Sequence, residues 1–315
     1  MSNRMKLTLL AVFAILFIVI YLFAGLQGNW SYILSRRASR IVAIVITGAV
    51  IAVATIVFQT ITNNRILTPG LIGLGSLYQL IQTFIIFFYG STSLTATDQN
   101  INYLLSVAIM IFFALILFQI LFKKGHNIYF LLLIGLIFGT FFQSLSTFMQ
   151  VLIDPNEFLN VQNRMFASFN NVQTDLLYMS ILFLTIVFIY FLRFYKYLDV
   201  LSLGKEHAIN LGVDYNYLVR RLMIVVAILI SIATALVGPI MFLGILVVNV
   251  CYEMFKTYRH AVLLSGAILI SIIALVGGQL IVDRIFAFST TLSVIINLIG
   301  GVYFLYLILK ENRTW

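Results

Sequence analysis

The chain has 315 residues, of which 62% are hydrophobic and only 9% are charged, with a mean hydropathy of +1.09 and a net charge of +9. A soluble protein carries about 25% charged residues to cover its surface, so a soluble globular fold is excluded and lipid must be the outer solvent. The single cysteine, Cys251, excludes an internal disulfide.

The N-terminal stretch MSNRMKLTLLAVFAILFIVIYLF resembles a signal peptide. It has no small-x-small cleavage site, and its apolar run of about 20 residues is long enough to span a bilayer, so we predict that it is the first membrane helix. Further apolar runs and only three prolines indicate an all-α polytopic membrane protein, and not an outer-membrane barrel. The candidate spans lie at about 7–26, 41–60, 71–89, 101–122, 128–152, 176–192, 222–237, 240–252, 261–282 and 285–309.

The region 222–252 decides the number of spans, because it is long for one crossing and short for two. Gly238-Pro239 in its middle is expected to break the helix. If the region crosses twice, both termini lie on one side, and placing that side in the cytoplasm puts 14 basic residues inside and 5 outside. A single crossing gives 11 and 8. The positive-inside rule therefore predicts about ten spans, with a short broken pair at 222–252 and both termini cytoplasmic.

This topology separates the basic residues but not the acidic ones, which divide evenly between the two sides. The basic residues inside are Arg4, Lys6, Arg65, Lys123, Lys124, Arg193, Lys196, Lys205, Arg220, Arg221, Lys256, Arg259, Lys310 and Arg313; those outside are Arg36, Arg37, Arg40, Arg164 and Arg284. The basic excess thus reports orientation in the membrane, and no nucleic-acid partner is expected.

Several kinds of catalytic and coupling chemistry are missing from the sequence. There is no G-x-x-x-x-G-K-[ST] phosphate loop, and the three histidines show no metal-ligand spacing, so we expect no metal and no cofactor. No predicted span has Asp, Glu, Lys or Arg in its interior, although proton-driven carriers usually need a carboxylate there. An enzyme or a proton-coupled carrier is disfavoured, which leaves a conduit opened from outside the chain, or a receptor.

The stretch LGKEHAINLGV, residues 203–213, is a polar segment between two predicted membrane spans. Ser202 or Leu203 can begin a helix there, and Gly212 is a natural left-handed stop. Such a helix is too short to be stable alone, so it needs a partner surface. The alternative is an ordinary cytoplasmic loop helix.

Four stretches, in the right order, are similar to those of the iron-siderophore and cobalamin ABC permeases, the type II importers. One stretch resembles the family's cytoplasmic coupling loop in the spacing of Gly204, Ala208, Leu211, Gly212 and Val213. VGPIMFLGILVVNV (237–250) resembles the family's G-P-I-x-F-x-G stretch, and GGVYFLYLIL (300–309) fits its C-terminal end. NRILTPGLIGLG (64–75) resembles N-P-L-A-x-P-x-x-L-G, with Arg65 in place of the first proline.

The resemblance implies a single transmembrane permease domain over residues 1–315, with a cytoplasmic coupling loop at 199–219 that contacts the ATPase through Gly204, Glu206, Ala208, Leu211 and Gly212. Ala208 is expected to face the ATPase, because only a small side chain permits close docking, and Leu211 is expected to pack beneath it. The chain is then not an enzyme. Two ATPase subunits hydrolyse ATP, and a second permease chain and an extracytoplasmic binding protein complete the importer.

The segment after the G-P-I stretch departs from most of the family, which reads V-P-H-x-x-R where this chain has Val248, Asn249 and Tyr252. The variant resembles a branch with permeases for petrobactin, anguibactin and other catechol-type siderophores, in which two different permease chains commonly work together. We therefore predict a bacterial inner-membrane permease subunit for ferric siderophores. A haem or cobalamin permease is the alternative within the family, and a non-transporting receptor or scaffold is the alternative outside it.

Uncharged polar residues lie within or beside the predicted spans. Those that we expect to line a translocation path are Gln59, Gln82, Gln143 and Asn249. Hydrogen bonding between helices is an equal alternative for each of them.

The stretch LSRRASRIV places Arg36, Arg37 and Arg40 outside, against the positive-inside rule. Anchoring to lipid phosphates is one explanation. The family has an R-x-x-R at this place that meets acidic residues of the binding protein, which implies that Arg37 and Arg40 form a docking site. Arg284, at the outer end of the ninth predicted span, is its expected third member. Arg37 and Arg40 share a helix face if the second span begins as a helix there.

Overall fold

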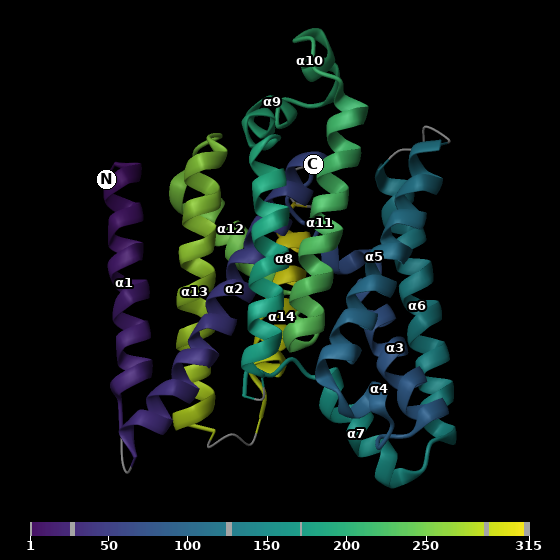
Figure 1. Cartoon of the computed structure of the whole chain (residues 1–315). Helices are drawn as coiled ribbons and strands as arrows, with labels where there is room; N and C mark the ends of the chain where they lie inside the picture. Colours follow the sequence, from purple (N-terminus) through teal and green to yellow (C-terminus); the bar gives the residue numbers. More distant parts are fainter. Residues whose placement is uncertain (1, 26–28, 124–127, 171, 287–289, 312–315) are drawn as a thin grey trace.

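A computed structural model describes residues 2–25, 29–123, 128–170, 172–286 and 290–311, and all regular structure in these ranges is helical (Figure 1). The helices are α1 (Asn3–Phe23), α2 (Trp30–Thr62), η1 (Pro69–Ile72), α3 (Leu74–Tyr89), α4 (Leu94–Thr97), α5 (Gln99–Lys123), α6 (Ile128–Leu152), α7 (Pro155–Met165), α8 (Thr174–Leu192), η2 (Tyr195–Tyr197), α9 (Leu198–Leu201), α10 (Lys205–Asn210), α11 (Tyr215–Val237), α12 (Leu243–Phe255), α13 (His260–Arg284) and α14 (Leu292–Glu311).

Seven of the described helices are long and apolar enough to cross a membrane, namely α1, α2, α5, α6, α8, α11 and α13. Three shorter apolar helices, α3, α12 and α14, accompany them. The chain is therefore an all-helical, multi-pass membrane protein, and the N-terminal stretch forms a helix as predicted. These seven are fewer than the ten spans predicted from the sequence.

α2 and α11 exceed their predicted spans by the most, because polar residues extend or cap them. α2 has 33 residues, about 50 Å at 1.5 Å per residue, and so includes the arginine stretch that precedes the apolar run 41–60. Asn29 caps its first turn by accepting a hydrogen bond from the Tyr32 amide. α11 starts at Tyr215, where the Asp214 side chain accepts from the Tyr217 amide. The prediction of two short helices in 222–252 was therefore wrong for α11, which has 23 residues, and only α12, with 13, is short.

The core of the bundle lies around α2 and α11. In each of them 72% of the most apolar window is buried within the chain, against 17% in α1. α2 packs along α13 and α11, α3 packs along α6, and α1 lies on the outer side of α13 (Figure 1). The central helices are thus screened by protein, while α1 presents most of its surface to the surroundings.

The short helices mark the two ends of the bundle. Figure 1 shows the start of α1 together with α9 and α10 at one end, which we call the α10 end. The Lys6 ammonium donates to the Met254 carbonyl oxygen there, so the last turn of α12 belongs to the same end. α4 and α7 lie at the opposite end, the α7 end. Two of the basic residues predicted to lie inside, Lys124 and Arg313, fall outside the described residues.

Candidate functional site

A helix is present in the segment 203–213, but it is shorter than expected, and its role in coupling stays a prediction. α10 has six residues and begins at Lys205, not at Ser202 or Leu203. Gly204 precedes it with φ +92° and ψ 168°, a conformation that favours glycine and separates α10 from α9. Gly212 follows it with φ +79°, the left-handed stop that the sequence predicted.

The orientation of α10 is the reverse of the prediction for Ala208 and for Leu211, the residue that follows the helix. Ala208 is 0% exposed within this single chain, whereas Leu211 is 62% exposed. Ala208 therefore faces α9 and α11, because its methyl group permits the close approach of this short helix to them. The exposed apolar side chains of the segment are Leu203, Ile209 and Leu211, which we call the α10 apolar surface. Glu206 is exposed beside it.

A hydrogen-bonded cluster that the sequence did not indicate lies behind this segment. His260, the first residue of α13, is 4% exposed, and its Nδ1 lies 2.6 Å from Oδ1 of Asp199 in α9. The same carboxylate oxygen accepts the His260 backbone N–H at 2.8 Å. On the other side of the ring, Nε2 lies 2.8 Å from Oγ1 of Thr60 in α2. The sequence showed no metal-ligand spacing at this histidine and gave it no role.

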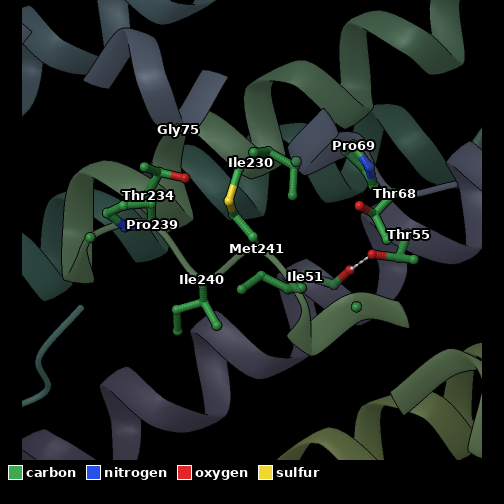
Figure 2. A pocket seen from close by; sticks show the side chains of 13 residues that line it. Ile51, Thr55, Thr68, Pro69, Gly75, Ile230, Thr234, Pro239, Ile240 and Met241 are labelled. Carbon is green, nitrogen blue, oxygen red and sulfur yellow. Dashed lines mark hydrogen bonds between the residues drawn. The ribbon is translucent and has the colours of Figure 1, made fainter. Parts of the chain in front are cut away.

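The helix break occurs where Gly238-Pro239 predicted it. Gly238 ends α11 with φ +97° and ψ 172°, and a Cβ atom there would lie 2.9 Å from Cα of Ala167. Only glycine fits both conditions. Figure 2 shows the irregular segment beside the residues that precede α3, with Met241 between Pro239 and Pro69. Two of the stretches that resemble the permease family therefore meet at one place.

A small cavity lies at this meeting point. It has a volume of about 30 Å³, and its walls include Thr55, Thr68 and Thr234 (Figure 2). Thr55 donates its hydroxyl hydrogen to the Ile51 carbonyl oxygen at 2.7 Å. The cavity has room for little more than water, so it is no binding site for a bulky ligand.

Three of the four predicted path residues are buried, and their side chains form hydrogen bonds within the chain. The side-chain amides of Gln59 and Asn249 both donate to the Arg65 carbonyl oxygen, at 2.7 and 3.3 Å. Gln82 donates to Asn102 at 2.9 Å and accepts from the guanidinium of Arg164 at 2.8 Å. The alternative of hydrogen bonding between segments thus describes these three residues.

Gln143 differs from the other three, because it is exposed on α6. Thr140 and Thr147 are exposed on the same helix at spacings of three and four residues from it, and Ser144 is exposed beside them. We call these four residues the α6 polar stripe. The spacing is readable in the sequence, but only Gln143 was singled out there.

The three predicted docking arginines gather at the C-terminal end of α1. Arg37 donates through Nη1 to the carbonyl oxygens of Tyr21, Leu22 and Ala24, at 3.2, 2.9 and 2.8 Å. Arg284 also donates to the Ala24 carbonyl oxygen. Arg40 is half-buried, and its Nε atom is buried without a hydrogen-bond partner among the described residues. α2 is helical here, as the shared face of Arg37 and Arg40 required.

A larger polar cavity, missed by sequence reasoning, lies at the α7 end. It has a volume of about 310 Å³ and is lined by residues of α3, α5, α7, α8 and the end of α11. Arg164 reaches into its wall, where Nη1 donates to Gln82 Oε1 and Nη2 donates to the Ala96 carbonyl oxygen at 2.6 Å. Burial lowers the pKa of the Arg164 guanidinium. This residue ties α7 to α3 and α4.

Comparison with known proteins adds a family context to this geometry. The family model described as the FecCD transport family matches residues 4–310. The petrobactin import system permease protein YclO of Bacillus subtilis (strain 168) is 59% identical over 316 residues, which cover 100% of both chains. The petrobactin import system permease protein FatC of Bacillus anthracis is 38% identical, covering 89% of this chain and 79% of that one.

The fold also matches a solved structure. A metal-chelate type ABC transporter in an inward-facing conformation aligns with a TM-score of 0.79 and 22% identity, covering 98% of this chain and 100% of that chain. The likeness extends over the whole bundle, so the arrangement of helices described above is that of a known membrane fold.

Proposed function

Because the chain belongs to the FecCD transport family, we propose that it is the permease subunit of a binding-protein-dependent ABC importer for a ferric siderophore. The observation that carries this proposal is the 59% identity to a petrobactin permease along the entire chain. The same similarity favours a siderophore of the petrobactin class over the alternatives of haem and cobalamin. A non-transporting receptor or scaffold is the rival outside the family.

The chain supplies half of a translocation path, and a second, different permease chain supplies the other half. The cavity beside Pro239 is too small for an iron chelate, so we assign the path to the surface between the two chains. The α6 polar stripe supports this assignment through the exposed side-chain amide of Gln143, which is better covered by a partner or by water than by lipid. The hydroxyls of Thr140 and Thr147 already donate to backbone carbonyls within α6. Gln143 is therefore the path-lining residue among the four that the sequence suggested.

The membrane topology follows from the two ends of the bundle. We place the α10 end and both termini in the cytoplasm of a bacterial inner membrane, with ten spans formed by the seven long helices and the three shorter apolar ones. At this end the coupling segment contacts the ATPase. Its α10 apolar surface makes the contact, Glu206 lies at the rim, and Gly204, Ala208 and Gly212 set the shape of the segment.

The α7 end receives the extracytoplasmic binding protein. Arg37, Arg40 and Arg284 form a positive cluster there, and within the described part of the chain no carboxylate lies at ion-pair distance from any of them. The hydrogen bonds of Arg37 and Arg284 go to neutral carbonyls, which leaves the positive charge of these two residues available to acidic residues of a partner. Exposed ion pairs contribute only about 0–1 kcal/mol each, so the cluster sets orientation and encounter rate more than affinity.

The substrate class is tested with the complete importer in proteoliposomes, containing this chain, its second permease, two ATPases and the binding protein. A panel of chelates competes for uptake of labelled ferric petrobactin. We expect petrobactin-class ferric chelates to compete and haem and cobalamin to leave uptake unchanged. Competition by haem or cobalamin alone would transfer the assignment to that substrate.

A further inference from the structure

The cluster of Asp199, His260 and Thr60 joins three helices that are distant in the sequence. Asp199 and His260 are 61 positions apart, and Thr60 and His260 are 200 apart. Three hydrogen bonds of 2.6 to 2.8 Å hold them together. A contact with this many short bonds at the edge of a membrane bundle fixes the relative position of α2, α9 and α13.

The chemistry of the groups determines which atoms donate hydrogen bonds to Asp199. A carboxylate only accepts hydrogen bonds, so the His260 Nδ1 atom beside Asp199 carries a hydrogen and donates it. Asp199 also accepts the backbone N–H of His260, which as the first residue of α13 has no acceptor within its own helix. One carboxylate oxygen therefore holds both the side chain and the first turn of α13.

Thr60 connects the cluster to the backbone of α2. The Thr60 hydroxyl lies 2.8 Å from His260 Nε2 and also 2.8 Å from the carbonyl oxygen of Ile56. Thr60 is 7% exposed and His260 is 4% exposed, so water does not compete freely for the bond between them, whereas the Asp199 side chain is 49% exposed. α2 in turn packs along α13 and α11 in the core of the bundle.

Asp199 lies in α9, which is connected to α10 by backbone hydrogen bonds. Backbone hydrogen bonds run without a gap from α9 to α10: the Ser202 amide donates to Leu198, the Gly204 amide to Leu201, and the Ala208 amide to Gly204, at 3.0 to 3.1 Å. The Ser202 hydroxyl adds a bond to the Asp199 carbonyl oxygen at 2.7 Å. A displacement of α10 is therefore carried to Asp199.

From this continuous chain of contacts we infer that Asp199, His260 and Thr60 are positioning residues that transmit movement of the coupling segment to α2 and α13. The inference rests on the proposed function, because it presupposes that an ATPase moves this segment. The cluster acts at the α10 end only, and it touches neither the α6 polar stripe nor the docking arginines.

The test compares the number of ATP molecules hydrolysed per chelate imported in the proteoliposome system. Thr60→Val removes the hydroxyl with little change of shape, and Asp199→Asn removes the charge that holds His260. We expect each to raise the ratio of hydrolysis to import by about 2- to 30-fold, the range for residues that carry coupling between sites. The double variant should be no worse than the worse single variant, because both break the same chain of contacts.

Matched controls separate transmission from general damage. Thr62→Val removes a buried hydroxyl that bonds only within α2 and to the adjoining Asn64 carbonyl. Asp98→Asn alters an acid outside the coupling loop, whose side chain accepts backbone amides at the first turn of α5. Both should keep the wild-type ratio. Thr60→Ser, which restores the hydroxyl, should also keep it, and this pair of Thr60 variants decides the matter if Asp199→Asn fails to fold.

The outcomes are distinguishable. Absence of ATP-driven import by the wild-type complex refutes the proposed function itself. If the wild type imports, and Thr60→Val and Asp199→Asn both match their controls, the proposed function stands and the inference about this cluster is refuted. Independent, multiplying effects of the two variants also refute it, because they would show that the residues do not act as one unit.

Discussion

Arg37 and Arg284, from opposite parts of the chain, donate hydrogen bonds to the same backbone oxygen, the carbonyl of Ala24 at the end of α1. The last carbonyls of a helix lack partners within the helix and carry partial negative charge, so cations are favourable there. This gives the outer arginines a role besides the two that the sequence suggested, lipid anchoring and docking. Arg37 holds α1 against α2 whether or not a binding protein is present.

Arg37→Gln should destabilise the chain. It removes charge-assisted bonds to three carbonyls, and hydrogen bonds to a charged group contribute about 1.5–3 kcal/mol. We expect a lower unfolding temperature in detergent. Arg36→Gln is the matched control, because Arg36 is exposed on the same turn. Equal stability of the two variants would show that the capping bonds contribute nothing.

Leu211→Asp and Ala208→Val should separate coupling from folding. Leu211 is exposed, so an acid there should leave stability unchanged while ATP hydrolysis coupled to import falls by roughly tenfold or more. Ala208 is fully buried, and two added methyl groups should overpack the segment by about 1–3 kcal/mol. Thermal unfolding and coupled hydrolysis are measured for both. Full coupling in Leu211→Asp would remove the α10 apolar surface from the ATPase contact.

Gly238→Ala should lower stability by about 1–3 kcal/mol, because a side chain at φ +97° is strained and its Cβ would meet the backbone of Ala167. Gly301→Ala is a suitable comparison, since a Cβ there meets nothing within 4 Å. Unfolding temperatures of the two purified variants give the answer. If both variants match the wild type, the tight turn after α11 is not required.

Accessibility of introduced cysteines should report the topology. The native Cys251 is buried and gives little background. Tyr258, 72% exposed, follows α12, and Leu159, 58% exposed, lies on α7. We expect a membrane-impermeant maleimide to label Leu159→Cys in intact cells and Tyr258→Cys only after permeabilisation. Labelling of Tyr258→Cys from outside would mean that residues 222–252 cross only once.

The helical class, the break at Gly238-Pro239 and the stop at Gly212 could be read from the sequence, because apolar runs and helix breakers act locally. The sequence prediction placed the first residues of α2 and α11 too far inside the apolar runs. Their caps, Asn29 and Asp214, carry a sequence signal that hydropathy alone does not weigh.

The facing of α10 could not be predicted, because six residues give too short a pattern and its neighbours decide which side is buried. The same limit hid the partners of His260, since contacts across 61 and 200 positions leave no local pattern. The four polar path candidates differed only in their surroundings. Three found partners within the chain, and Gln143 did not become buried.

Uptake of radioactive iron, supplied as ferric petrobactin, into proteoliposomes containing the complete importer tests the central claim most directly. The binding protein is added outside the vesicles and ATP is enclosed. We predict uptake that needs ATP, the binding protein and this chain together, and that stops when the ATPase subunits carry a substitution abolishing hydrolysis. Absence of uptake with every component present and active, or equal uptake with the inactive ATPase, would contradict the assignment of this chain as a permease of an ATP-driven importer.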